Sequence, residues 1–368
     1  MKITFIGRDV APSRAFSMVK ERFSGDAVCA FLGDGKPIAA GPDEIIGAVR
    51  TSDILISGMS SAPYLVEEEL AAITAADFAH VPVILYADTH NSAGRPWFEG
   101  VRKCVSAIWV VSQKEARQAK EIFGLPEDRV ILSGNPVVEK SFYPEISREE
   151  SRRRIGVKEG EHLILSSGYK YPSITLPTLI AIVQAAVHLE AQGSQLKLCV
   201  VASIHPGDDA FRANTGFYNG IMDYFLYNEA VADLKNLRFR ICCSRDIEEE
   251  NLIPTEEILP GADLLISTLS TTDQEAAAQR IPVIEFFTPL AMSRMQKNFS
   301  TQKWETCEQG VAYEVFDDTR RLAQLVYQVL WNGVSDAMRH AQEEHYTKPK
   351  KKALDVMEET IRSFSKKL

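Results

Sequence analysis

The sequence has little of what marks secreted, membrane-spanning or metal-binding proteins. Its six cysteines are scattered and form no CxxC pair, so we expect reduced thiols, no disulfide framework and no metal site. Charge appears too early in the first residues for a signal peptide. No run of residues approaches the roughly 20 apolar positions needed to cross a bilayer. These absences predict a soluble, cytoplasmic protein without a transmembrane segment.

Excess positive charge is also missing. The chain has 41 Lys and Arg residues against 50 Asp and Glu residues, for a net charge of -9. Nucleic-acid-binding proteins usually carry a basic stripe, because phosphate contacts dominate their affinity. The basic runs at 152–154, 348–352 and 366–367 are typical of solvated helix faces. We therefore expect no nucleic-acid partner, while weak peripheral contact with anionic lipid remains open for the basic tail.

What the chain does have is a regular alternation of short Val/Ile-rich runs with amphipathic segments. At 368 residues it exceeds the size of one growing hydrophobic core, so two domains are expected. Strand-like runs without a period of two, separated by helical patterns, predict βαβ units with parallel sheets covered on both faces. The predicted strands are 3–6, 28–32, 54–57, 81–86, 107–111, 130–132, 163–166, 196–201, 237–242, 264–267, 283–286 and 311–315.

A charged stretch around residues 144–161 interrupts the alternation. We interpret it as the boundary between two α/β domains, each a Rossmann-like parallel sheet, which face each other across a cleft. The predicted organisation is a first domain over 1–145, a linker over 146–161 and a second domain over 162–334. A helical tail over 335–368 is expected to pack back on the first domain.

In open α/β sheets, ligands bind beyond the carboxyl ends of the strands. After the predicted strand 264–267 comes a hydroxyl-rich turn, Ser270-Thr271-Thr272, followed by Glu275 in a predicted helix. Free N–H groups at a helix start, together with these hydroxyls, favour phosphate. An ordinary N-cap, with Glu275 completing a capping box, explains the same residues and stays as the alternative.

Two further loops follow predicted strands of the second domain. Gly168 and Lys170 follow the first of these strands, where a glycine lets a ligand approach the backbone and a lysine would neutralise phosphate charge. His205 stands at the end of the next strand, held between that strand and a Pro-Gly pair. A surface lysine and a structural histidine are the alternatives.

Several of these segments together resemble the glycosyltransferase-B superfamily of nucleotide-sugar enzymes. The resemblance rests on the passage Gly134-Asn135-Pro136-Val137, on the stretch 262–283, and on 296–298 followed by 308–312. By pattern the chain is similar to the transferase that adds N-acetylglucosamine in peptidoglycan-lipid synthesis and to UDP-N-acetylglucosamine 2-epimerases. The resemblance covers most of residues 81–332 and implies a role in cell-envelope or polysaccharide biosynthesis.

The resemblance implies roles for individual residues of the second domain. Ser270, Thr271 and Thr272 would hold a diphosphate, Glu275 would bind ribose hydroxyls, and His205 would lie near phosphate or sugar. A uracil-type base would meet the segment that ends at Ile253. The implied ligand is a nucleotide sugar, UDP-linked, which is a substrate and not a cofactor.

The first domain departs from both families. The glycine-rich loop of the peptidoglycan-lipid transferase is replaced by Gly7-Arg8-Asp9 and the turn to Arg14, with one glycine. Arg8 or Arg14 matches an early arginine of the epimerases, and Asp9 is a reserve base on the acceptor side. The turn 57–61 matches the place of a later epimerase aspartate and has no carboxylate, and Ser267 stands where retaining transferases carry a glutamate. The first departure counts against epimerisation, and the second counts against a retaining transfer.

Asp88, His90 and Asn91 follow the predicted strand 81–86, where related enzymes place an acceptor-facing carboxylate. An inverting transfer needs a base for the attacking hydroxyl, which Asp88 or His90 would supply. Ordinary turn chemistry is the alternative. We thus expect an inverting glycosyltransferase with an unidentified acceptor. A UDP-sugar 2-epimerase or hydrolase, and a non-catalytic binding protein on the same fold, remain the alternatives.

Overall fold

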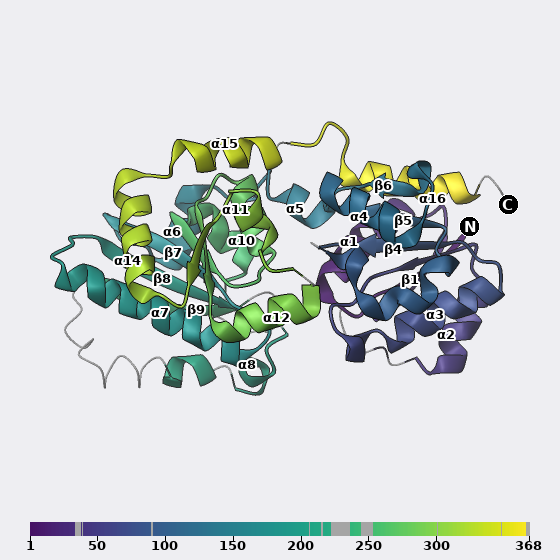
Figure 1. Ribbon diagram of the computed structural model, residues 1–368, viewed down its shortest axis with the longest axis horizontal. Coiled ribbons are helices and arrows are strands. Elements are labelled where there is room, and N and C mark those ends of the chain that lie inside the picture. The colour runs from purple at the N-terminus through teal and green to yellow at the C-terminus, as the bar shows by residue number, and fades with distance from the viewer. Residues whose placement is uncertain are drawn as a thin grey trace. The chain divides into compact units, whose positions relative to one another are not determined.

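A computed structural model describes residues 1–33, 38, 40–89, 91–205, 207–214, 216–221, 236–243, 253–299, 301–346 and 348–365 (Figure 1). The chain divides into two compact units. Unit 1 combines 1–140 with 296–301 and 348–368, and unit 2 combines 141–295 with 302–347.

Unit 1 is built on a six-stranded parallel sheet in the order β2-β1-β3-β4-β5-β6. Its strands are β1 (Lys2–Ile6), β2 (Val28–Leu32), β3 (Ile54–Ser57), β4 (Val83–Ala87), β5 (Ala107–Val110) and β6 (Val130–Leu132). Its helices are α1 (Val10–Arg22), α2 (Pro42–Arg50), α3 (Glu67–Phe78), α4 (Gln113–Phe123), α5 (Pro136–Lys140) and α16 (Ala353–Ser365).

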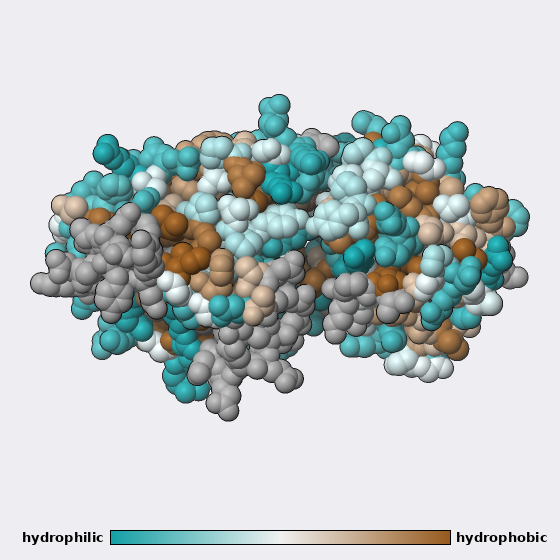
Figure 2. Space-filling view, turned by 90° about the horizontal axis from the view of Figure 1, so that it is seen from below, coloured by the Kyte–Doolittle hydropathy of each residue, from teal (hydrophilic) through white to brown (hydrophobic). Residues whose placement is uncertain are grey.

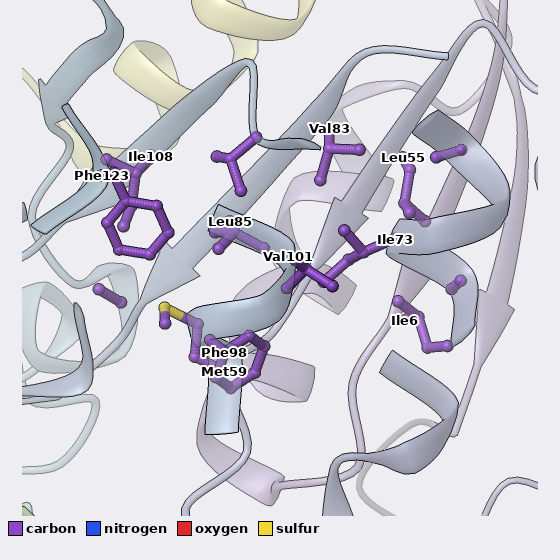
Figure 3. Close-up of a cluster of buried hydrophobic side chains, with 14 of the residues drawn as sticks. Ile6, Leu55, Met59, Ile73, Val83, Leu85, Phe98, Val101, Ile108 and Phe123 are labelled. Atoms are coloured by element: carbon purple, nitrogen blue, oxygen red, sulfur yellow. The ribbon is translucent and has the colours of Figure 1, made fainter. Parts of the chain in front are cut away.

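Both faces of this sheet are covered, as the strand composition predicts. On one face, Leu55, Val83, Leu85 and Ile108 pack against α2, α3 and α4 (Figure 3). On the other face, aromatic side chains of the strands pack against α1 and α16. The last helix of the chain thus completes the core that the first strand begins.

Unit 2 is also built on a six-stranded parallel sheet, but its strand order, β12-β11-β10-β7-β8-β9, differs from that of unit 1. Its strands are β7 (Glu161–Ser167), β8 (Lys197–Ile204), β9 (Leu237–Cys243), β10 (Leu264–Ser267), β11 (Val283–Phe287) and β12 (Tyr313–Phe316). Its helices are α6 (Arg148–Ile155), α7 (Pro172–Ala191), α8 (Asp209–Ala213), α10 (Thr255–Ile258), α11 (Thr272–Ala278), α13 (Glu305–Glu308), α14 (Thr319–Tyr327) and α15 (Asp336–His345). Helix α12 (Pro289–Phe299) contributes to both units.

Helix α7 is long and apolar enough to cross a bilayer by length and composition, contrary to the sequence expectation, with 20 residues and a hydropathy of 1.5. Within unit 2 it packs against the sheet, with Ile182 and Leu189 in one apolar cluster and Leu179 and Val183 in another. A helix with apolar side chains buried in two separate clusters is typical of a core helix.

The segment 146–161, predicted as a linker with one short helix, contains α6. This helix is fixed to unit 2, because Arg152 donates to the Asp263 carboxylate at 2.8 Å and Ser151 donates to the Ile258 carbonyl at 3.0 Å. The expected tail is divided between the units. In α15, Gln342 donates to the Ile281 carbonyl of unit 2 at 3.0 Å, whereas α16 packs on unit 1.

Hydrophobic side chains on the face drawn in Figure 2 lie in separate patches between hydrophilic ones. The most exposed large apolar residues include Phe78, Val28 and Trp331. Folded proteins normally expose much apolar area. These residues therefore indicate no particular site.

Candidate functional site

The loop after β10 gathers hydroxyl groups at the carboxyl end of the unit 2 sheet. The Ser167 hydroxyl, at the end of β7, lies 2.9 Å from the Ser270 hydroxyl and donates to the Thr272 hydroxyl at 3.1 Å. The Thr272 N–H donates to the Ser270 hydroxyl at 3.3 Å. Thr271 is the N-cap of α11 but makes no side-chain cap. The ordinary N-cap interpretation is therefore wrong for Thr271.

Glu275 does not complete a capping box, because it is the fourth helical residue of α11 and not the third. It is half-exposed, as are Ser270 and Thr271. Since α11 has only seven residues, a phosphate bound here would depend mainly on the loop's hydroxyl and N–H groups.

The turn itself depends on Leu269, a buried non-glycine residue with φ of 55°. Left-handed backbone is unfavourable for such a residue unless its surroundings hold it. Here the Leu269 N–H donates to a carboxyl oxygen of Glu285 at 3.3 Å, and the neighbouring Thr268 hydroxyl donates to the Phe286 carbonyl at 2.6 Å. Two residues of β11 thus hold the hydroxyl loop, residues 268–272, in place.

Gly168 occupies a crowded turn after β7. Its N–H donates to the Ser203 carbonyl of β8 at 2.9 Å. A Cβ added at this position would lie 3.0 Å from the Thr175 methyl carbon and 3.3 Å from the same Ser203 carbonyl oxygen. The glycine is therefore required by close packing at the sheet edge, beside Ser270.

His205 lies at the end of β8, and its Nδ1 accepts the Gly207 N–H at 2.9 Å. This bond places the proton of the neutral ring on Nε2. The hydroxyls of Ser203 and Thr255 hydrogen-bond to each other, so the chain beside Ile253 is tied to the end of β8. Gly168, His205 and Ile253 thus belong to neighbouring loops at one edge of the unit 2 sheet.

Lys170 is part of a cationic group that the sequence did not reveal. Its ammonium lies 5.6 Å from the ring centre of Tyr171, and the Arg294 guanidinium carbon lies 4.8 Å from the same ring centre. Cations over a tyrosine ring are held in place by its negative face. Arg294, on α12, is therefore a second positive charge at this edge of unit 2.

In unit 1, Asp88 is buried after β4. Burial raises its pKa to about 7, and the charge of Arg95 opposes that rise. Arg95 is 2% exposed. Its Nη2 donates to the Thr89 hydroxyl at 3.1 Å, while its Nε and Nη1 have no hydrogen-bond partner among the residues that the structure describes. A guanidinium left short of partners beside a carboxyl gives this loop an unusual charge balance.

Asn91 has a structural role. Its side-chain amide donates to the Phe299 carbonyl at 2.9 Å, and its N–H donates to Glu115 at 3.0 Å. Burial raises the pKa of Glu115 to about 7. His90 lies outside the described residues. The predicted acceptor-side loop is thus fixed by Glu115 and Asn91, both inside unit 1.

Asp9 also holds a loop, accepting the Ser61 N–H at 2.7 Å. Next to it, buried Glu69 accepts both the N–H and the hydroxyl of Ser60, at 2.9 and 2.8 Å. Burial raises the pKa of Glu69 to about 8. The turn after β3 is therefore held by two carboxyl groups.

The two candidate arginines of unit 1 differ. The Arg8 guanidinium pairs with Glu68 at 3.4 Å, whereas Arg14 is exposed on α1. Sequence reasoning missed Arg95, Glu69 and Glu115, because nothing in their spacing distinguishes them from surface charges. Among the residues that the structure describes, no group of three His, Cys, Asp or Glu side chains is arranged to hold a metal ion.

No protein-family model matches the chain, and no curated protein matches it in sequence. Solved structures match it along its whole length. The UDP-GlcNAc 2-epimerase of Neisseria meningitidis, bound to UDP-GlcNAc, is 12% identical with a TM-score of 0.64, covering 99% of this chain and 100% of that one. The Methanocaldococcus jannaschii UDP-GlcNAc 2-epimerase, in complex with UDP-GlcNAc and UDP, is 15% identical with a TM-score of 0.58, covering 100% of both chains.

A wall teichoic acid polymerase matches as well, at 11% identity with a TM-score of 0.56, covering 100% of this chain and 89% of that one. Identities this low support an inference about fold and not about activity. Together with the two six-stranded parallel sheets, these matches show that the chain has the glycosyltransferase-B fold.

Proposed function

We propose that this chain is an enzyme that acts on a UDP-linked sugar, held by unit 2. The observation that carries the proposal is the set of loops at one edge of the unit 2 sheet, where Ser167, Ser270 and Thr272 join their hydroxyls next to Gly168. Neighbours of the same fold are described with UDP or UDP-GlcNAc bound.

In this proposal the diphosphate is bound by Ser270, Thr271 and Thr272. Glu275 accepts hydrogen bonds from the ribose hydroxyls, and His205 donates through Nε2 to a phosphate or sugar oxygen. Lys170 and Arg294 supply the positive charge that a diphosphate requires. Ile253 contacts the base. The sugar nucleotide is the substrate.

Asp88 is the proposed general base. A base works best when its pKa lies near the working pH, and burial raises the pKa of Asp88 to about 7. Abstraction of the proton at C2 of the sugar, with departure of UDP from C1, leaves a glycal. Return of UDP to C1, with a proton delivered to the other face of C2, gives the C2 epimer, an outcome that the epimerase neighbours favour. Abstraction from an acceptor hydroxyl leads to inverting transfer, which is favoured by the lack of a carboxylate in the turn 57–61, where the epimerase resemblance implies an aspartate.

The first test is UDP binding. A ligand present at 100 times its dissociation constant stabilises the folded state by about 2.7 kcal/mol, so the unfolding midpoint should rise by a few degrees. Glu275→Ala should weaken UDP binding by roughly ten- to a hundredfold, since bonds to a charged acceptor contribute about 1.5–3 kcal/mol. Glu343→Ala, which removes an exposed carboxylate of α15, is the matched control. An unchanged midpoint with UDP would rule the proposal out.

The second test separates the activities. UDP-GlcNAc is incubated with the protein, without an acceptor, and the nucleotide products are separated by chromatography. A C2 epimer indicates epimerisation, free UDP indicates hydrolysis, and turnover only after addition of an acceptor indicates transfer. If UDP binds and no condition gives turnover, the chain is a binding protein on an enzyme fold.

A further inference from the structure

Two carboxyl groups lie buried beneath the hydroxyl loop of unit 2. Asp273 belongs to the first turn of α11, Glu285 belongs to the middle of β11, and both are 0% exposed. The two carboxyl groups lie close enough that the charge of Asp273 raises the pKa of Glu285. Two ionised carboxylates out of water repel each other, and neither has a proton to donate to the other. One proton between them removes both costs.

The remaining contacts show how that proton is placed. One Asp273 oxygen accepts the Trp304 indole N–H at 2.6 Å and the Thr306 hydroxyl at 2.9 Å, and the other accepts the Gln274 N–H at 2.6 Å. With three donors directed at it, Asp273 is the ionised member. Glu285 is then the protonated member and donates to Asp273.

The same Glu285 carboxyl supports the loop above it. Its two oxygens accept the Ser267 hydroxyl at 2.9 Å and the Leu269 N–H at 3.3 Å. The second bond holds Leu269 at its positive φ, one residue before Ser270. Glu285 therefore joins the buried proton to the backbone of the predicted phosphate-binding loop.

We propose that Asp273 and Glu285 share one proton and act as positioning residues, which hold loop 268–272 in the shape that receives the diphosphate of a nucleotide sugar. The ligand half of this inference rests on the proposed function. The shared proton itself does not. If Glu285 loses its proton, two negative charges face each other out of water, and the Leu269 and Ser270 backbone loses its fixed support.

The charged and titratable surroundings favour this arrangement. Burial, reinforced by the charge of Asp273, raises the pKa of Glu285 well above its ordinary value. Burial also raises the pKa values of the Cys307 thiol and the Tyr346 phenol, which therefore stay neutral beside the pair. Among the described residues, Glu305, Glu314 and Lys303 are further charged groups close enough to affect the Cys307 thiol or the Tyr346 phenol.

The sign of the pH effect follows from linkage. The pKa of Glu285 is raised in the folded state, so its contribution to stability is fully present below the pKa of the unfolded chain and is lost as pH rises through the folded value. The wild-type unfolding midpoint, measured without ligand, should therefore fall as the solution becomes alkaline. In Glu285→Gln the amide N–H donates to Asp273 and the amide oxygen accepts from Ser267 or Leu269. The unfolding midpoint of this variant should therefore fall less than that of the wild type as the pH rises.

The experiment measures the unfolding midpoint from about pH 6 to about pH 9 for the wild type, Glu285→Gln and the control Asp336→Asn, which alters an exposed carboxylate of α15. A smaller alkaline decline in Glu285→Gln, with Asp336→Asn behaving as the wild type, supports the shared proton. Equal declines in all three overturn it.

Calorimetric titration with UDP tests the positioning role. Wild-type affinity should fall by up to about tenfold per pH unit once the shared proton is lost, while Glu285→Gln should keep its affinity. Because UDP itself ionises in the same way for both proteins, the ratio of the two affinities isolates the carboxyl pair. Glu285→Ala, if it folds, should bind UDP weakly at every pH.

The outcomes separate the two proposals. If the wild type and Glu285→Gln bind UDP with the same pH dependence, the positioning role is overturned while the proposed function stands. If the wild-type chain does not bind UDP, the proposed function and the ligand half of this inference both fall. In that case the pH dependence of unfolding, measured without ligand, still tests whether Asp273 and Glu285 share a proton.

Discussion

Both sheets are six-stranded and parallel, but their strand orders differ, and so does the chemistry of the loops at their carboxyl edges. In unit 1 the loops after β3 and β4 are held by buried carboxyl groups with raised pKa values, Glu69 and Glu115. In unit 2 the loops after β7 and β10 carry hydroxyls and a glycine, and the buried Glu285 carboxyl supports the second of them. Buried carboxyl groups thus shape the loops of unit 1, whereas hydroxyl groups shape the loop of unit 2 that we propose to bind the diphosphate.

The largest expected effect comes from removing the proposed base of unit 1. Asp88→Asn should lower turnover of the sugar nucleotide by about 10²- to 10⁴-fold, the usual contribution of a general base. UDP affinity should stay the same, in contrast to Glu275→Ala. In the wild type, turnover should rise with pH through about 7, as Asp88 ionises.

Steady-state kinetics and UDP titration on the same preparations check whether Asp88→Asn loses turnover and keeps its UDP affinity. Asp128→Asn, which alters an exposed carboxylate before β6, is the matched control and should leave both measurements unchanged. Full turnover in Asp88→Asn would assign the base to another residue.

A smaller effect is expected from the helix that completes the unit 1 core. Met357 of α16 is fully buried, and Met→Ala substitutions at such sites reduce the free energy of unfolding by about 2–5 kcal/mol. Met357→Ala should speed hydrogen exchange in β1, β3 and β4 and leave β7 and β10 protected. Met338→Ala, on α15 of unit 2 and 2% exposed, should do the reverse. Equal loss of protection in both units would mean that they unfold as one.

The smallest expected effect concerns the pH dependence of unit 1. Burial raises the pKa of Glu69 to about 8, so the folded state binds a proton that the unfolded chain releases at lower pH. This contribution to stability is present in acid and is lost as pH rises through about 8. Glu69→Gln should flatten the decline, as measured by hydrogen exchange in β3 at several pH values. An unchanged decline would show that Glu69 is already ionised in the folded protein.

Most of the fold could be predicted from the sequence, because buried parallel strands leave a strong signal. The strands at 28–32, 54–57 and 264–267 have the predicted bounds. Helix α2 was not predicted, since it is short and Gly47 interrupts its pattern. Helix α6 was predicted as part of a linker, because its arginines bind Asp263 and backbone carbonyls and leave little apolar periodicity.

The candidate site was only partly predictable. Ser270, Thr272 and Gly168 follow strands in the sequence, and the structure brings them to one edge of a sheet. Asp9 and Asn91 were predicted on the acceptor side, and the structure uses both to hold loops. Glu285 could have been noticed as a lone carboxyl in the apolar run Val283–Phe287. Its partner Asp273 could not be identified, because their contact depends on the packing of α11 against β11.

The placement of α16 has a consequence for how the protein is made. The core of unit 1 needs Met357, Ile361 and Phe364, which are synthesised after all the residues of unit 2. Domains are generally completed in order from the amino terminus during synthesis. Here the residues of unit 2 are complete first, so the apolar face that α16 covers stays open until residues 353–365 have been made.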